Sequence, residues 1–123
     1  MAKKNAQALT AANRFVRAVQ ESGVRLQAAY LYGSCATGHA RPDSDIDVAL
    51  VSPDFTGWID DLRLIASAVI AADPRIEHVR FHPRDFRAEN PLAWEIIAKG
   101  VPLVGSGKLN SRKPPRRRAK RRL

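Results

Sequence analysis

Apolar side chains recur at helical spacing near the start of the chain. Between residues 5 and 22 they fall every three or four positions, at Leu9, Ala12, Phe15, Val16 and Val19. This period predicts an amphipathic helix, and Gly23 is a typical helix end. We expect the apolar stripe of this helix to cover a β-sheet.

Two more helices are predicted further along the chain. In residues 58–72 the apolar positions fall mainly on one stripe, at Trp58, Leu62, Ile65, Val69 and Ile70. Asp60 and Asp61 suit the first turn of that helix as N-terminal charges without a catalytic role. Residues 91–99 form the third helix, with a proline in the first turn and Gly100 at the end. Its expected buried side consists of Trp94, Ile97 and Ala98.

Four short apolar runs alternate with these helices and predict strands. They cover residues 26–32, 45–51, 75–81 and 101–104 and are bounded by turn residues. Pro102 favours an edge position for the last strand, because proline cannot donate a ladder hydrogen bond. With 123 residues, 45% of them hydrophobic, the chain is expected to form one compact α/β domain.

Two carboxylates open the second predicted strand. Asp45 and Asp47 point to the same side, because side chains alternate along a strand. They lie about 7 Å apart along the chain, close enough to share divalent cations. Asp47 also interrupts an apolar run, where an unpaired carboxylate would be costly.

A Gly-Ser pair ends the first predicted strand, ten residues before these carboxylates. Gly33 permits positive φ and close approach to the backbone. Ser34 suits a helix N-cap position, where N–H groups and a hydroxyl can bind an anion. An isolated Asp-x-Asp is more often a loop or helix-cap feature. Here, however, the Gly-Ser turn follows one predicted strand and the two carboxylates open the next. This arrangement favours a Mg²⁺ site that faces a phosphate-binding turn, and therefore phosphoryl or nucleotidyl transfer.

These residues resemble the signature of a known family. The minimal nucleotidyltransferase (MNT) branch of the DNA polymerase β-like superfamily carries Gly-Ser, ten residues and Asp-x-Asp. The positions that match are Gly33, Ser34, Asp45 and Asp47. The resemblance extends over residues 26–104, and Gly38 and Ser44 fit the usual loop of the family.

The resemblance implies an α/β (α+β) fold with a mixed β-sheet flanked by helices. It also implies ATP as substrate, Mg²⁺ as cofactor, and transfer of AMP to a hydroxyl group. Gly33, Ser34 and Ser44 would then bind the nucleotide, and Asp45 and Asp47 would bind the metal. Many small members are antitoxins that adenylylate a HEPN toxin, so a HEPN-type partner protein is implied.

The family uses a third carboxylate on a later strand as metal ligand and general base. Glu77 stands where the family usually has Asp, although taken alone it would be a surface charge at a strand edge. Asp85 is the alternative, but Pro83-Arg84-Asp85 is typical of a turn or helix entry. The loop also departs from the family pattern, because Cys35 and Thr37 stand near positions that often carry arginine.

The net charge of +9 is concentrated at one end of the chain. Residues 1–107, the expected nucleotidyltransferase domain, hold equal numbers of basic and acidic residues. The whole excess lies in residues 108–123, a segment with two prolines and almost no apolar residues, which we expect to be disordered alone. This basic tail could bind RNA or an acidic surface, or be a dispensable extension.

Composition excludes several other classes of protein. The single cysteine, Cys35, excludes an intrachain disulfide and argues against a zinc cluster. No stretch approaches the about 20 continuous apolar residues of a membrane span. The first residues lack the apolar core of a signal peptide, so a cytoplasmic location is expected.

Two other functions stay open at the level of sequence. One is an aminoglycoside-type enzyme that modifies a small molecule, although such enzymes usually need a further helical domain or a dimer. The other is an inactive module with the same fold that binds RNA or protein through the basic tail.

Overall fold

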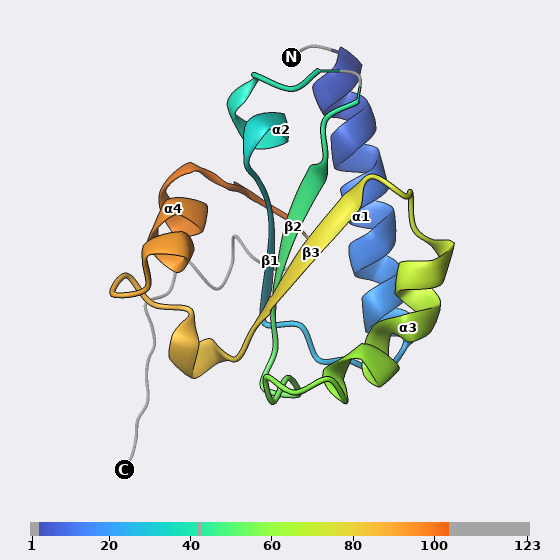
Figure 1. Ribbon diagram of the computed structural model, residues 1–123, viewed down its shortest axis with the longest axis vertical. Helices are drawn as coiled ribbons and strands as arrows, with labels where there is room; N and C mark the ends of the chain where they lie inside the picture. The colour runs from blue at the N-terminus through green and yellow to red at the C-terminus, as the bar shows by residue number, and fades with distance from the viewer. Residues whose placement is uncertain (1–2, 42, 104–123) are drawn as a thin grey trace.

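A computed structural model describes residues 3–41 and 43–103 (Figure 1). The elements in chain order are α1 (Lys3–Glu21), β1 (Ala28–Tyr32), α2 (Ser34–Thr37), β2 (Ile46–Val51), α3 (Asp61–Ala71), β3 (Ile76–Phe81), the 3-10 helix η1 (Pro83–Asp85), α4 (Pro91–Lys99) and β4 (Val101–Pro102). Residues 108–123, the predicted basic tail, lie outside the described residues, as do residues 104–107.

The strands form one mixed sheet in the order β3-β2-β1-β4. β1 runs antiparallel to β2 and to β4, whereas β2 and β3 are parallel. Parallel neighbours need a crossover, and α3 supplies it between β2 and β3. The predicted α/β fold with a mixed sheet is therefore confirmed, and Pro102 lies on an edge strand as expected.

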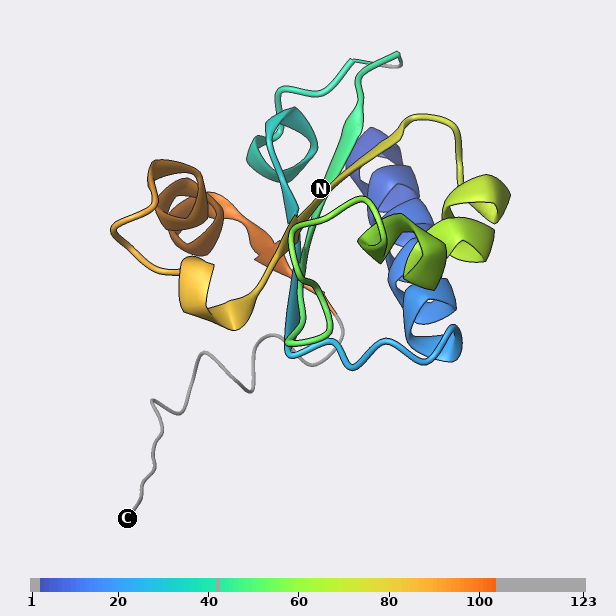
Figure 2. The ribbon, with the colours of Figure 1, turned by 60° about the horizontal axis from the view of Figure 1, so that its bottom comes forward.

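The helices cover both faces of the sheet. α1 and α3 lie on one face, and α4 and η1 lie on the other (Figures 1 and 2). The predicted stripe of α1 is confirmed, because Ala12, Phe15, Val16 and Val19 are buried against the sheet and Leu9 is partly buried. A smaller cluster under α4 joins residues of β1, β2 and β3 to two residues of the helix, Ala93 and Ile96.

The predicted buried stripe of α3 is correct only at Ile65. The helix begins at Asp61, and its inward side consists of Asp61, Ile65 and Ala68. Trp58 precedes the helix with 73% of its surface exposed, and Ile70 is 84% exposed. Helical spacing gives the period of the pattern, but which stripe turns inward depends on packing against α1, so Ala68 is buried in place of the larger Val69.

The same error affects α4, although its predicted bounds are correct. Trp94 and Ile97 are about half exposed, and Ala98 is exposed as well. The buried residues are Ala93 and Ile96. The small Ala93 side chain lets the helix pack closely against the sheet.

None of the helices in the described part of the chain is both long enough and apolar enough to cross a membrane.

Candidate active site

The strand register brings two of the expected carboxylates side by side. Asp47 of β2 pairs with Glu77 of β3 on one side and with Tyr32 of β1 on the other. The three residues form a row across the sheet, which we call the acidic row. Asp47 lies on the same face as Ala49 and Val51, which pack in the cluster under α4. The acidic row is therefore on the α4 face.

Asp45 adds a second carboxylate to the start of β2. It is exposed and lies two residues before Asp47, just outside the strand. The Cys35 thiol donates a hydrogen bond to the Asp45 backbone carbonyl over 3.3 Å. This bond ties α2 to the residue that leads into β2.

The acidic row carries unbalanced negative charge. Burial raises the pKa of Asp47, and the charges of Asp45 and Glu77 raise it further. Burial likewise raises the pKa of the Tyr32 phenol, with further increases from Asp47 and Glu77. Both pKa shifts arise in part because neighbouring negative charges repel each other. A bound cation would relieve this repulsion, because the same carboxylates would attract it.

The turn between β1 and α2 is shaped by Gly33. Its φ of 73° and ψ of −154° belong to a region used almost only by glycine. A Cβ atom at this position would overlap the Asp47 carboxylate. Glycine is therefore needed both for the backbone conformation and for the position of Asp47.

The expected role of Ser34 as N-cap is wrong. Ser34 is the first residue of α2, Gly33 occupies the N-cap position, and no side chain caps the helix. The N–H groups of Ala36 and Thr37 donate to the Gly33 carbonyl oxygen. Those of Ser34 and Cys35 have no acceptor within residues 3–41 and 43–103, so the turn can donate two hydrogen bonds to a ligand.

Ser44 has a local partner. The Arg41 N–H donates to the Ser44 hydroxyl oxygen over 2.7 Å, which closes the loop before Asp45. Ser44 lines a cavity together with Gln7, Ala8 and Arg75, close to α1. The structure thus brings Gly33 to Asp47 but holds the Ser44 hydroxyl within its own loop.

Asp85, the alternative third carboxylate, lies elsewhere. It is an exposed residue of η1, which follows the end of β3. Glu77 pairs with the first residues of β2, whereas Phe81, four residues before Asp85, pairs with the last. Of the two candidates, Glu77 is the one beside Asp47.

The donor atoms at this site are the kind that Mg²⁺ prefers. Asp45, Asp47 and Glu77 offer carboxylate oxygens only, and hard divalent cations take oxygen ligands. In the described part of the chain, no three His, Cys, Asp or Glu side chains already converge on one point suitable for a metal. The oxygen donors and the uncompensated negative charge of these residues fit a cation. To bind it, the carboxylates would have to move toward one common point.

Two glycine substitutions test how the turn is built. We expect Gly33→Ala to lower the free energy of unfolding by about 3 kcal/mol, because it adds the overlap with Asp47 to backbone strain. Gly38→Ala is the matched control. Gly38 also has positive φ, but its Cβ position is open, so we expect a cost of only about 1 kcal/mol. Urea denaturation measures both, and equal losses would contradict the predicted overlap.

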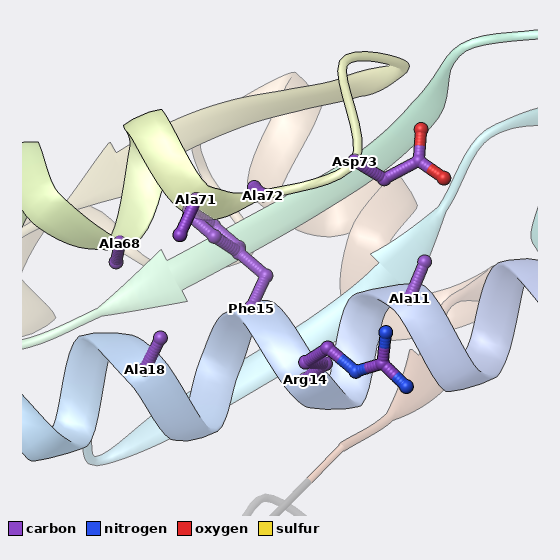
Figure 3. A pocket seen from close by; sticks show the side chains of 8 residues that line it. All are labelled: Ala11, Arg14, Phe15, Ala18, Ala68, Ala71, Ala72 and Asp73. Atoms are coloured by element: carbon purple, nitrogen blue, oxygen red, sulfur yellow. The ribbon is translucent and has the colours of Figure 1, made fainter.

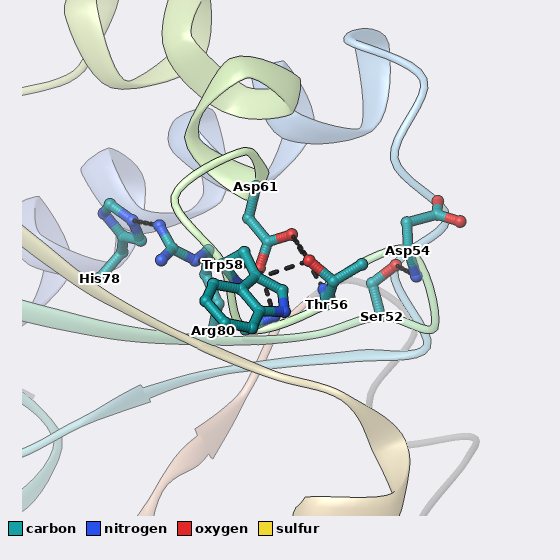
Figure 4. Close-up of polar contacts among 8 residues, drawn as sticks. Ser52, Asp54, Thr56, Trp58, Asp61, His78 and Arg80 are labelled. Atoms are coloured by element: carbon teal, nitrogen blue, oxygen red, sulfur yellow. Dashed lines mark hydrogen bonds and ion pairs between the residues drawn. The ribbon is translucent and has the colours of Figure 1, made fainter.

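A buried acidic network lies on the opposite face of the sheet, where the sequence predicted only a helix-start charge. Asp61 is 2% exposed. Its carboxylate accepts hydrogen bonds from the Thr56 N–H, the Thr56 hydroxyl and the Gly57 N–H, at 2.9–3.0 Å (Figure 4). Arg80 of β3 places its Nε 3.8 Å from the same carboxylate. The Thr-Gly pair four to five residues before Asp61 is the sequence signal for this loop.

His78 extends this network along β3. The Arg80 guanidinium lies 3.4 Å from His78 Nε2, and the imidazole ring packs against Phe15 of α1. Burial lowers the pKa of His78, and Arg80 lowers it further, while Glu77 opposes the shift. His78 is thus a packing residue, and it lies on the sheet face away from the acidic row.

A cavity of about 340 Å³ also lies on that opposite face, between α1 and α3 (Figure 3). Its walls are mostly alanines, with Phe15, Arg14 and Asp73 among the lining residues. It includes no residue of the acidic row.

A family model supports the interpretation of these residues. The model described as "Polymerase beta, Nucleotidyltransferase" matches residues 16–108. This range includes the Gly33 turn and every carboxylate of the candidate site.

Known proteins show the same similarity. Protein adenylyltransferase MntA of Shewanella oneidensis is 27% identical over 95 residues, which are 76% of this chain and 65% of that protein. A solved toxin–antitoxin structure with AMP-PNP has a TM-score of 0.59 at 22% identity, covering 80% of this chain and 77% of the other. A Sulfolobus solfataricus protein assigned as a nucleotidyltransferase has a TM-score of 0.54 at 20% identity, covering 69% and 79%. At such identities the two structures show a shared fold.

Proposed function

The chain belongs to the polymerase β nucleotidyltransferase family, and we propose that it transfers AMP from ATP to a hydroxyl group with Mg²⁺. The observation that carries this proposal is the pairing of Asp47 with Glu77 beside a glycine turn that offers two N–H donors. The carboxylate pair can hold a cation, and the adjoining glycine turn can hold a phosphate. These are the two requirements of nucleotidyl transfer.

Each residue then has a defined role. The N–H groups of Ser34 and Cys35 would hold phosphate oxygens of ATP. Asp45, Asp47 and Glu77 would hold Mg²⁺, which when bound neutralises phosphate charge and lowers the pKa of the acceptor hydroxyl.

The transfer step is a substitution at the α-phosphorus. The acceptor oxygen forms a bond to this atom while the bond to the bridging oxygen of pyrophosphate breaks, and Glu77 takes the acceptor proton. Glu77 suits this role because it is exposed at the edge of the sheet, where an acceptor can reach it.

The proposed acceptor is a hydroxyl of a partner protein of the HEPN type. The similarity to a protein adenylyltransferase and to solved toxin–antitoxin assemblies supports this choice. The chain spans about 65% of the MntA relative, so this acceptor is proposed for the matched domain. The basic segment 108–123 is proposed to assist by binding an acidic surface of the partner.

Transfer of label tests the reaction. Purified chain, Mg²⁺, α-³²P-ATP and a HEPN-type protein from the same organism should give labelled partner, and chelation of Mg²⁺ should abolish the label. We expect Glu77→Gln to slow transfer by about 10²- to 10⁴-fold, the usual contribution of a general base. Asp85→Asn is the matched control and should transfer at the wild-type rate.

Two results would contradict the proposal. Folded wild-type protein that binds neither Mg²⁺ nor ATP would exclude nucleotidyl transfer at this site. Transfer that survives Glu77→Gln but fails in Asp85→Asn would assign the third carboxylate to η1.

A further inference from the structure

Tyr32 occupies the end of the acidic row that the proposed reaction does not use. It pairs with Asp47 on the side opposite Glu77 and is the last residue of β1. Gly33 and Ser34 follow directly. Because consecutive Cα atoms are 3.8 Å apart, the Cα atoms of Tyr32 and Ser34 lie within about 7.6 Å of each other. Tyr32 therefore borders both the carboxylates and the N–H donors of the turn.

The side chain of Tyr32 has one apolar and one polar surrounding. It is partly buried and packs against the apolar cluster under α4, which includes Tyr30 and Ala49. Its hydroxyl makes no hydrogen bond to any residue in the described ranges. A partly buried aromatic ring whose hydroxyl has no partner among the described residues is well suited to contact a ligand that has both apolar and polar parts.

The two ends of the acidic row differ in what they offer a nucleotide. At the Glu77 end, β3 is the outermost strand of the described sheet, and Glu77 itself is exposed. At the Tyr32 end, the aromatic ring packs against the apolar cluster under α4. A nucleoside needs an apolar or aromatic surface to pack against, whereas the acceptor hydroxyl needs open access to the general base, Glu77. Such a surface is at the Tyr32 end and the open access is at the Glu77 end.

We infer that Tyr32 is the nucleoside-binding residue of this site, with its ring packed against the base and ribose while the phosphates lie at the Gly33 turn. The inference rests on the proposed function and adds to it the direction in which the nucleotide lies across the sheet. Tyr32 then sets affinity for nucleotides over other polyphosphates, and takes no part in moving the proton.

A pair of ligands separates this role from a structural one. Isothermal titration calorimetry of the full chain would compare Mg²⁺ with AMP-PNP and Mg²⁺ with tripolyphosphate, which lacks the nucleoside. We expect Tyr32→Ala to weaken AMP-PNP binding by about tenfold or more, as for loss of one aromatic–base contact. Tripolyphosphate affinity should stay within about twofold, and that binding also shows that the variant is folded. Tyr32→Phe keeps the ring and should restore AMP-PNP affinity.

Phe86→Ala is the matched control for loss of an aromatic ring. Phe86 belongs to the same apolar cluster but lies near Tyr30 and Phe81, away from the acidic row. Its removal should leave both affinities unchanged.

Three outcomes would overturn the inference. They are unchanged AMP-PNP affinity in Tyr32→Ala, an equal loss for both ligands, and a wild type that binds AMP-PNP no more tightly than tripolyphosphate. A wild type that binds neither ligand with Mg²⁺ present would instead reject the proposed function.

Discussion

Replacing Asp47 by asparagine should abolish nucleotidyl transfer without destabilising the fold. We expect Asp47→Asn to lower the transfer rate by at least about 10²-fold, because it removes a carboxylate from the proposed metal site. We also expect the melting temperature to be unchanged or about 1–4 °C higher, because the substitution relieves burial of a charge and its repulsion by Asp45 and Glu77.

The sign of this stability effect follows from the direction of the pKa shift. The pKa of Asp47 is raised on folding, so the folded state holds its proton to higher pH than the unfolded state. Stability is therefore lost as pH rises from the ordinary aspartate pKa through the raised one, and the loss is complete above it. The advantage of Asp47→Asn in melting temperature should be present at pH 7.5 and shrink towards pH 3.

Ligand and control measurements make this prediction specific. Mg²⁺ with AMP-PNP should raise the melting temperature of the wild type, because ligand binding to the native state stabilises it, and should raise that of Asp47→Asn far less. Asp43→Asn changes an exposed aspartate of the same loop and should behave as wild type in both assays. An Asp47→Asn variant that is active, or clearly less stable at pH 7.5, would refute the assignment.

Replacing Asp61 by alanine should strongly destabilise the fold, unlike the replacement of Asp47. We expect the free energy of unfolding to fall by about 3–5 kcal/mol. The N–H groups of Thr56 and Gly57 would lose their acceptor, and Arg80 would lose its buried counter-ion. Asp60→Ala is the matched control. Asp60 is exposed and its side chain caps no N–H group, so its loss should cost less than about 0.5 kcal/mol.

The pH dependence of this second effect can be measured in the same denaturation experiment. Burial alone would raise the pKa of Asp61, but the hydrogen bonds from Thr56 and Gly57, together with the charge of Arg80, lower it overall. Stability from a carboxylate with a lowered pKa is present above its ordinary pKa and disappears as pH falls through the lowered value. The difference between wild type and Asp61→Ala should therefore be full at pH 7 and smaller below pH 3. Equal stability of the two proteins at pH 7 would show that the network is dispensable.

Local features of the candidate site were predictable because they depend on neighbours in the chain. The alternation of side chains along a strand predicts that Asp45 and Asp47 share one side, and the structure places Asp47 in β2 and Asp45 just before it. The need for glycine at position 33 was also visible, although its cause was not. The carboxylate that a side chain there would overlap belongs to Asp47, fourteen residues later.

The errors came from features that depend on distant residues. Ser34 suits an N-cap position by residue type, but Gly33 takes that position because the chain turns there against the Asp47 carboxylate, in a backbone conformation that glycine adopts. Trp58 and Trp94 lie on the apolar stripes that helical spacing predicts to be buried. They are exposed because the inward stripes of α3 and α4 are set by contact with α1 and with the sheet.

The sequence by itself determined the order and type of the elements, the paired carboxylates at the start of β2 and the turn before α2. These depend on periodicity, turn chemistry and spacing, all of which act over a few residues. Only the tertiary structure decided that Glu77 lies beside Asp47, that Tyr32 closes the same row, and that Asp61 is buried under Arg80. Each of these depends on strand register or helix packing, which join residues far apart in the chain through the burial of whole surfaces.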